Sequence, residues 1–195
     1  MNTPTPITCV QRFIDRFTKL LSGEIIPGRN ECSMPYDSEW ERDFEWVLSK
    51  HLADFITLRN QVSFGAFRAD YAFECSKTER IWIVEFDGKS FHDTEKDEIR
   101  DQIIFRKNPK VQSIARVDAS TGHFEHMETR AMLAQLMPEC FEVVYSPQYD
   151  WHRSGDVYTA KVFDQRYDEG NWLVDGELSE NAPHLTLKIQ FKNRP

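Results

Sequence analysis

The chain has 195 residues, of which 40% are apolar and 13% aromatic. This composition is typical of a folded protein with one main core and excludes a disordered or fibrous chain. Acidic residues outnumber basic ones, 32 to 24, which gives a net charge of −8. Proteins that hold nucleic acid through bulk positive charge are therefore excluded, and any such contact requires a local basic patch.

Neither a membrane span nor a secretory signal is recognisable. The sequence has no apolar run of about 18 residues or more, and its first residues lack a basic stretch followed by an apolar one. We therefore expect a cytoplasmic protein without a membrane partner. The cysteines at 9, 32, 75 and 140 are far apart and form no CxxC pair, which predicts free thiols and no cysteine-based zinc site.

The N-terminal third predicts two helices joined by a linker. Apolar residues recur at helical spacing over 7–21, and Gly23 ends this amphipathic segment. The proline- and glycine-containing stretch 24–37 predicts a linker. A second helix begins at Ser38 and continues to about His51, because Ser38 can cap it and Glu41 completes a capping box.

The middle of the chain predicts a mixed α/β core. Short segments rich in β-branched and aromatic residues predict three strands, a charged segment with interspersed apolar residues predicts a helix, and a further strand and helix follow. Four such segments, 55–59, 61–64, 68–74 and 81–86, together make up the three strands, and helix 93–107, strand 111–117 and helix 122–137 follow.

After Pro138 the pattern changes to short strands over 141–145, 157–163, 172–174 and 184–191. Strict alternation in the last of these favours an antiparallel C-terminal β appendage. We therefore predict three parts: an N-terminal helix and linker over 1–37, a core over 38–137 and a β-rich extension over 138–195.

Three carboxylates mark the centre of the predicted sheet. Asp70 falls in one strand, and Glu85 and Asp87 end the next, where apolar residues would be expected. A divalent cation would relieve their repulsion, since Mg²⁺ takes oxygen ligands and is typically held by one or two carboxylates while a substrate phosphate completes its shell. This pattern predicts a Mg²⁺ site at Asp70, Glu85 and Asp87, with Mn²⁺ as a substitute.

The residues that follow could serve a metal-bound water. Glu85 and Asp87 point to the same face of a strand, and Gly88 allows the backbone to turn sharply. Lys89 and His92 then lie within reach and could orient or deprotonate a water for attack on a phosphodiester. The pattern does not choose between these two, and a solvated loop accounts for both equally simply.

Six ordered fragments within residues 38 to 118 resemble the PD-(D/E)xK nucleases, in particular the branch that includes very short patch repair endonucleases. The matching fragments fall on the predicted helix that begins at Ser38, on the paired strands, on the next helix and on the last core strand. The matching residues are Ser38, Glu41, Arg42, Phe44, Gln61, Phe67, Arg68, Asp70, Tyr71, Val84, Glu85, Asp87, Gly88, His92, Arg100, Asp101 and Arg116.

The resemblance implies a restriction-endonuclease-like α/β fold, a mixed sheet flanked by helices. It implies that Asp70 and Glu85 are metal ligands and that Glu41 is an accessory acid, with Gln61 nearby, although the capping box alone explains Glu41. Asp87 stands where the family has a catalytic lysine. The resemblance therefore implies that the attacking water is assisted either by Lys89, from a shifted position, or by His92, which matches a histidine of the related repair enzymes. Reading the motif one step later, as Asp87, Gly88 and Lys89, would leave Glu85 in a supporting role.

A local positive segment offsets the overall acidity. Residues 102–116 carry four basic and no acidic side chains. A solvated helix face is the simplest explanation, and a surface that tracks phosphates is the functional one. The candidate nucleic-acid contacts are Gln61, Arg68, Arg100, Arg106, Lys107, Lys110 and Arg116.

These features favour a Mg²⁺-dependent DNA endonuclease, and the resemblance implies a repair, restriction or defence, or mobile-element setting. The missing lysine and the negative charge favour an alternative, a catalytically silent nuclease fold that binds nucleic acid or a protein. In a third alternative the chain cuts only when docked to a larger recognition protein or to a second copy of itself, through the N-terminal helix or the β tail.

Overall fold

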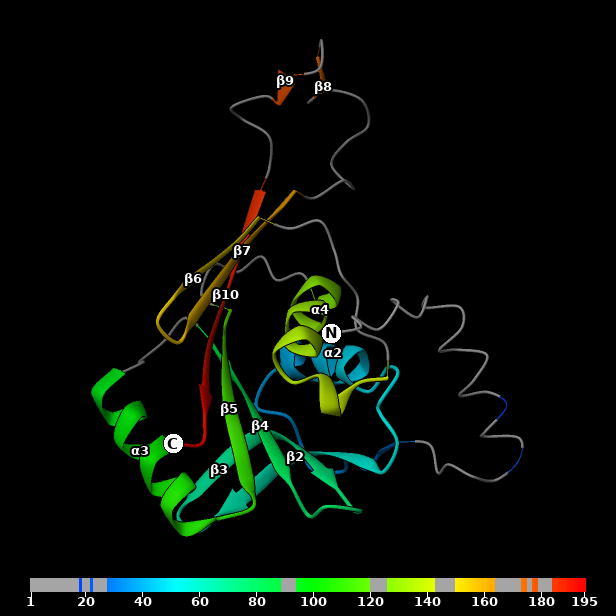
Figure 1. Ribbon diagram of the computed structural model, residues 1–195, viewed down its shortest axis with the longest axis vertical. Coiled ribbons are helices and arrows are strands. Elements are labelled where there is room, and N and C mark those ends of the chain that lie inside the picture. Colours follow the sequence, from blue (N-terminus) through cyan, green and yellow to red (C-terminus); the bar gives the residue numbers. More distant parts are fainter. Residues whose placement is uncertain are drawn as a thin grey trace, which may run out of the picture.

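The computed structural model describes residues 18, 22, 28–88, 94–119, 126–142, 150–163, 173–174, 177–178 and 184–195. These residues form an α/β protein in which a mixed eight-stranded sheet carries α3 on one face and α2 and α4 on the other (Figure 1). The predicted α/β class is confirmed. The predicted helix over 7–21 lies almost wholly outside the described residues. Within them, no helix is long and apolar enough to span a bilayer.

Helix α2 (Glu39–Leu48) begins at the predicted cap. The Ser38 hydroxyl accepts a hydrogen bond from the Glu41 amide at 3.2 Å, and the Glu41 carboxylate accepts one from the Asp37 amide at 3.1 Å. This exchange satisfies two amides at the helix start. It is the predicted capping box with one difference, because the Glu41 carboxylate accepts from the amide of Asp37, one residue before the N-cap Ser38. It also fixes the side of α2 that carries Phe44, which is fully buried against the sheet.

A three-stranded antiparallel meander and one crossover form the centre of the sheet. Strand β2 (Ile56–Phe64) pairs with β3 (Phe67–Cys75), which pairs with β4 (Ile81–Asp87). Helix α3 (Thr94–Lys107) then returns the chain to β5 (Val111–Asp118), which lies parallel to β4. A parallel neighbour requires such a crossover, and the predicted element order is confirmed here.

The C-terminal strands continue this sheet beyond β5. Strand β10 (His184–Asn193) pairs antiparallel with β5 and with β7 (Val157–Phe163), and β7 pairs with β6 (Asp150–Ser154). The predicted antiparallel arrangement is confirmed, but β6, β7 and β10 are hydrogen-bonded into the central sheet and are not an appendage beside it. The reason is that β5 would otherwise be an edge, whose free backbone groups β10 satisfies.

Four short elements and one helix complete the description. Within the predicted linker, a two-residue strand pairs parallel to β2 at the sheet edge. Two other short strands form a separate ladder, and α4 and a 3₁₀ turn precede the C-terminal strands. Their bounds are β1 Arg29–Asn30, α4 His126–Leu136, 3₁₀ helix Pro138–Cys140, β8 Leu173–Val174 and β9 Glu177–Leu178.

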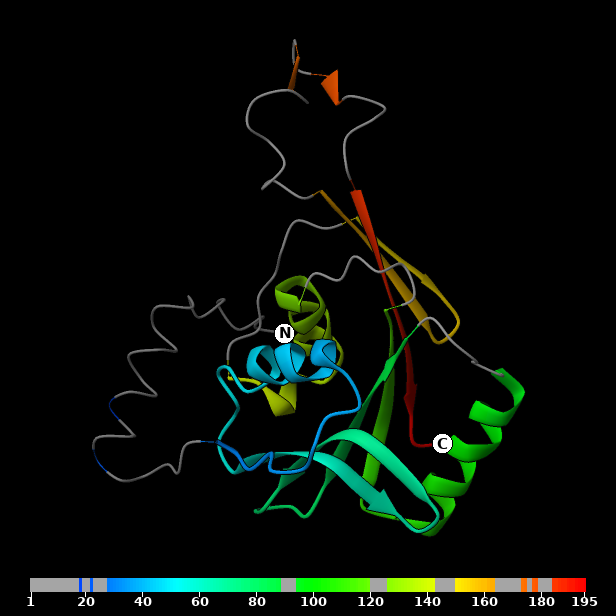
Figure 2. The same ribbon diagram turned by 180° about the vertical axis from the view of Figure 1, so that it is seen from behind.

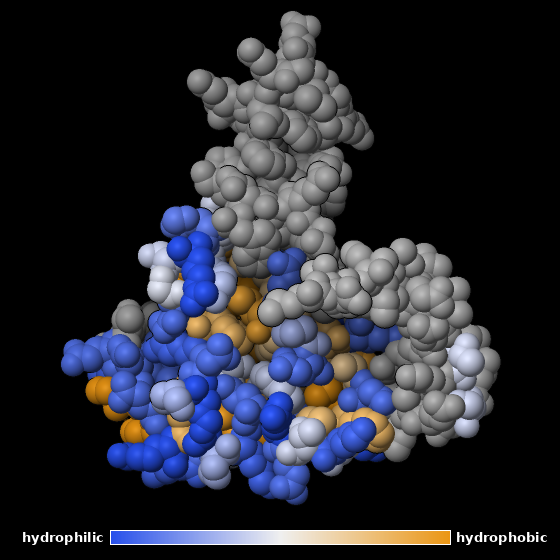
Figure 3. Space-filling model, viewed as in Figure 1, coloured by the Kyte–Doolittle hydropathy of each residue, from blue (hydrophilic) through white to orange (hydrophobic). Residues whose placement is uncertain are grey.

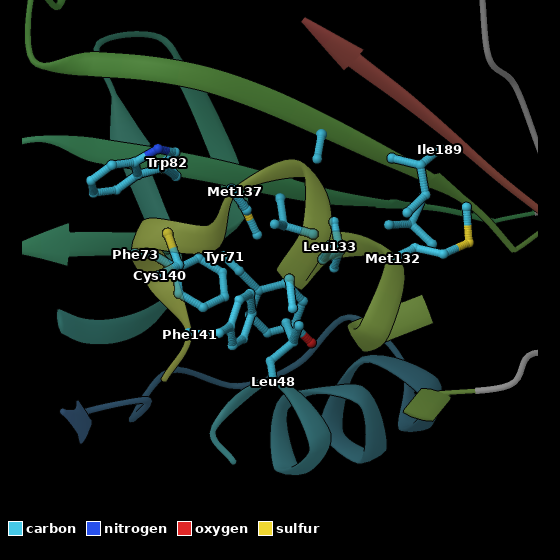
Figure 4. Close-up of a cluster of buried hydrophobic side chains, with 14 of the residues drawn as sticks. Leu48, Tyr71, Phe73, Trp82, Met132, Leu133, Met137, Cys140, Phe141 and Ile189 are labelled. Atoms are coloured by element: carbon cyan, nitrogen blue, oxygen red, sulfur yellow. The ribbon is translucent and has the colours of Figure 1, made fainter. Parts of the chain in front are cut away.

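The core divides into two clusters, one on each face of the sheet. The larger cluster lies between the sheet and helices α2 and α4 and includes Leu48, Phe73 and Leu133 (Figure 4). The smaller cluster lies under α3 and includes Ile104 and Ile114. The two faces of the sheet are thus buried to different extents, and the candidate site lies beside the smaller cluster.

Candidate functional site

Two carboxylates from neighbouring strands meet near the end of β4. Tyr71 pairs with Val84 in the β3–β4 register, so the preceding Asp70 stands opposite Glu85. The Asp70 amide donates to Glu85 Oε2 at 3.4 Å, and the Phe86 amide donates to Asp70 Oδ2 at 2.7 Å. The structure therefore brings together two of the carboxylates proposed from sequence as metal ligands.

A bend in the β2–β3 hairpin places Asp70 between the two layers. Gln61 has a φ of 53°, which is uncommon for a residue other than glycine. Leu58 packs in the larger cluster and Val62 against the smaller one, although a regular strand would keep residues four apart on one face. The alternation of side chains thus reverses at Gln61, which stands opposite Asp70 in the register of β2 and β3. The ribbon of this hairpin is visibly curved (Figure 2). Asp70 can therefore interact with groups from both sides of the sheet.

Glu85 is almost completely buried, with 4% of its surface exposed. Its Oε1 lies 2.6 Å from Arg100 Nη2, which also donates to the Arg68 carbonyl oxygen at 2.7 Å. The pKa of Glu85 is raised to about 8, mainly by burial and also by the nearby Asp70, against the lowering effects of Arg100 and Arg116. Arg100 is therefore the counterion of this buried carboxylate.

Two more carboxyl groups in the same region titrate above their ordinary range. Burial is the main cause that raises the pKa of Asp70, against the lowering effects of the Phe86 amide and Arg100. Burial also raises the pKa of Glu41, and the charge of Asp70 adds to the effect. Carboxyl groups perturbed by burial and by one another are typical of functional sites, although structural networks show the same pattern.

Glu41 has structural partners at both carboxylate oxygens. Oε2 accepts from the Asp37 amide and from Gln61 Nε2, the latter at 3.2 Å, and Oε1 accepts from the Ser38 hydroxyl at 3.0 Å. The Tyr71 hydroxyl also donates to the Glu41 carbonyl oxygen. These contacts tie α2 to β2 and β3. Glu41 and Gln61 are thus placed beside Asp70, but as supports of the helix start.

Asp87 belongs to a second polar network on the α3 side. Its Oδ1 lies 3.5 Å from Arg116 Nη1, and Arg116 also makes two hydrogen bonds to Asp101, at 2.7 and 3.2 Å. Arg116 is only 5% exposed. The prediction that Arg116 helps to track phosphates on the surface is therefore wrong, because a buried bidentate ion pair holds its guanidinium inside the protein.

The remaining basic candidates lie on the surface. Arg106, Lys107 and Lys110 are exposed, and Lys110 Nζ lies 3.1 Å from Glu79. Arg106 follows Arg100 by six residues, or about 9 Å along the helix axis. Figure 3 shows mainly hydrophilic residues around α3, with single apolar ones among them. This basic group therefore lies beside the carboxylate pair and not in it.

Arg68 stands nearer to the carboxylates. Its exposed side chain pairs with Asp37, and its carbonyl oxygen receives Arg100. Lys89 and His92 lie outside the described residues, so their predicted role at the attacking water stays a prediction.

The donor set suits a hard divalent cation. Asp70 and Glu85 offer carboxylate oxygens, and Mg²⁺ is commonly bound by one or two carboxylates with water and phosphate as its other ligands. The described residues contain no group of three or more His, Cys, Asp or Glu side chains that could hold a metal ion. A cation at this position would therefore depend on two protein ligands, with water or substrate as the others.

Asp101 matches the family motif in sequence, but the sequence alone assigned no role to it. It is 1% exposed and lies three and four residues before Ile104 and Phe105, which are also buried. The signal was available, because an acid on the apolar side of a helix needs a basic partner. The register supplies that partner at Arg116, which stands beside Glu85 across β5 and β4.

Comparisons of the chain with protein-family models, with curated proteins and with solved structures found no match.

Proposed function

We propose that the protein is a metal-dependent DNA endonuclease with a PD-(D/E)xK-like active site, in which Asp70 and Glu85 are the metal ligands. The observation that carries the proposal is the pair itself: the half-buried Asp70 and the buried Glu85 stand opposite each other on β3 and β4, and ionisation of Glu85 is unfavourable without a positive charge beside it. The order of helix, three strands, helix and strand around them agrees with the fold that the resemblance implies.

The roles of the residues follow from their positions. The Phe86 amide orients Asp70 Oδ2, and both Glu85 oxygens accept hydrogen bonds, from Arg100 and from the Asp70 amide. A cation would therefore bind Asp70 Oδ1 and take the place of a donor at Glu85. Mg²⁺ bound there would supply a more acidic water and stabilise the charge that develops on the phosphate. Glu41 and Gln61 hold α2 against the hairpin beside Asp70. Because Glu85 has a raised pKa, it must release its proton before it can bind a cation.

A group that orients or deprotonates the water is also needed. Asp87 does not suit this role, because an acid paired to Arg116 lacks the positive charge of the family's lysine. We assign the role to Lys89 or His92, which follow β4 directly in the sequence. Substitution of each residue by alanine, followed by a pH profile of cleavage, distinguishes a lysine from a histidine by the pH at which activity falls.

The test is cleavage of plasmid and single-stranded DNA with Mg²⁺, with Mn²⁺ and with chelator. Asp70→Asn and Glu85→Gln keep the shape of each side chain and remove its charge, so each should reduce cleavage at least about 100-fold. Asp43→Asn is the matched control, since Asp43 is an exposed acid on α2 paired only with its neighbour Arg42 in the described contacts. Cleavage that both site variants retain would show that the assignment is wrong.

One observation favours a second candidate, a silent nuclease fold that binds DNA or a protein. Arg100 already occupies Glu85, at 2.6 Å, and the described residues include no three-ligand metal group. This candidate predicts no cleavage with either metal by a folded sample, together with binding that survives Asp70→Asn. An electrophoretic mobility shift in chelator, beside the cleavage assay, separates the two candidates.

A further inference from the structure

Arg100 and Arg116 flank the same carboxylate but are held differently. Arg116 forms a bidentate pair with Asp101, lies 3.5 Å from Asp87 and from Asp97, and is 5% exposed. The positive charge of Arg116 is therefore balanced by these three aspartates and does not depend on Glu85. Removing Arg116 from this network would leave Asp101 buried without its main partner, which is strongly unfavourable. Arg116 is therefore a fixed part of the interior.

Arg100 lacks such an anchor. Among the described residues, its one carboxylate within ion-pair distance is Glu85, at 2.6 Å, and its other hydrogen bond is to the Arg68 carbonyl oxygen. Its guanidinium lies 5.9 Å from the centre of the Phe67 ring, and its side chain is 20% exposed. The guanidinium can thus reach solvent by rotation of its own side chain, with no buried acid left behind except Glu85.

A cation at Asp70 and Glu85 would compete with Arg100 for the same oxygens. Two positive groups on one buried carboxylate repel each other, whereas a phosphate at the mouth of the site attracts a free guanidinium. We propose that Arg100 is a displaceable counterion: a divalent cation takes its place at Glu85 and releases it to bind a phosphate of the DNA. This inference rests on the proposed function and adds a coupling between cation and DNA binding.

The number of phosphate contacts can be measured directly. The logarithm of DNA affinity falls with the logarithm of salt concentration, and loss of one phosphate contact reduces this slope by about 1. Binding of a short duplex is measured by fluorescence anisotropy against salt, in chelator and in Ca²⁺, which takes the same oxygen ligands with looser geometry than Mg²⁺. The proteins are the wild type, Arg100→Gln and Arg106→Gln, and the last removes the same charge from an exposed position on the same helix.

Arg100→Gln should reduce the slope by about 1 in Ca²⁺ and leave it unchanged in chelator, where Arg100 is held by Glu85. Arg106→Gln should have the same effect in both conditions. An equal change for Arg100→Gln in both conditions, or no change in either, overturns the displacement. Arg100→Lys, which keeps the charge, should retain the wild-type slope in Ca²⁺. If Arg100→Gln fails to fold, Arg100→Met, which also removes the charge, takes its place.

The wild-type measurement separates this inference from the proposed function. Absence of DNA binding, or of any Ca²⁺ effect on the wild type when calorimetry also detects no bound Ca²⁺, overturns the proposed function and the inference with it. Ca²⁺ binding to the wild type that leaves the contribution of Arg100 unchanged overturns the inference alone.

Discussion

The two faces of the sheet bury different kinds of residue. On the side of α2 and α4, the buried surface is a continuous apolar cluster in which aromatic rings contact one another, as Phe44 does with Tyr71 and Phe86. On the side of α3, a smaller apolar cluster adjoins buried charges, including Glu85 and Arg116. The first arrangement gains stability from packing, and the second keeps charges in place only while each has a partner.

The apolar face should carry most of the stability. Phe44→Ala removes a fully buried ring that contacts two other rings, and it should lower the free energy of unfolding by about 3–5 kcal/mol. Urea denaturation followed by circular dichroism measures the loss. Trp46→Ala, on the same helix but with 61% of its surface exposed, should change stability by about 0.5 kcal/mol or less. Equal losses of stability for both variants would contradict the claim that packing on the α2 and α4 side carries most of the stability.

The charged face should be sensitive to the loss of single partners. Asp101→Asn breaks the bidentate pair and leaves the Arg116 charge buried, so it should cost about 3 kcal/mol. The double variant Asp101→Leu/Arg116→Met removes both buried charges and should cost less than Asp101→Asn alone, because the groups that lose a partner, Asp87, Asp97 and Lys192, have side chains that are 16–24% exposed. Urea denaturation of the variants tests this, and a double variant that is the less stable of the two would be inconsistent with it.

The raised pKa of Glu85 predicts how stability depends on pH. The unfolded chain releases this proton near pH 4.5 and the native protein near pH 8, so the native state holds more protons in between. The free energy of unfolding should therefore fall as pH rises from about 5 to 8, by a few kcal/mol at most. In chelator, Glu85→Gln should flatten this decline, whereas Glu39→Gln, at an exposed position of α2, should not. A decline of equal size in both variants would assign it to other groups.

The smallest expected change in stability comes from the cap of α2, which should not affect the candidate metal site. Ser38→Ala removes the hydroxyl that accepts from the Glu41 amide, and it should cost about 1 kcal/mol. Thermal unfolding measures the loss, with the exposed Ser63→Ala on β2 as control. Because Asp70 and Glu85 keep their own partners, the metal dependence of any cleavage should be unchanged. A change in that dependence would show that the cap contributes to the site.

Local patterns were enough to predict most of the elements. Ser38 and Glu41 predicted the start of α2, because a capping box uses only neighbours in sequence. The β-branched and aromatic segments predicted β2, β3 and β4, since such residues fit a half-buried pleated surface. The place of Asp70 and Glu85 on neighbouring strands was foreseen in the same way, because a meander pairs consecutive strands.

Partners distant in sequence could not be foreseen from local patterns. Arg116 was expected on the surface as one of several basic residues, yet the register of β4 and β5 places it beside Glu85 and against Asp101. Asp87 was expected at the metal, and the same register turns it to Arg116. A charge has no preferred partner until the fold sets its distances, and burial then makes those distances decisive.

The sequence by itself determined the order of helices and strands from α2 to α4, the cap of α2 and which strands carry Asp70 and Glu85, because these depend on propensities and spacings within a few residues. The tertiary structure alone decided that β10 continues the sheet beyond β5, that the hairpin bends at Gln61, and that Arg100 is the counterion of Glu85. These features arise from contacts between segments far apart in the chain, where burial and pairing outweigh local preference.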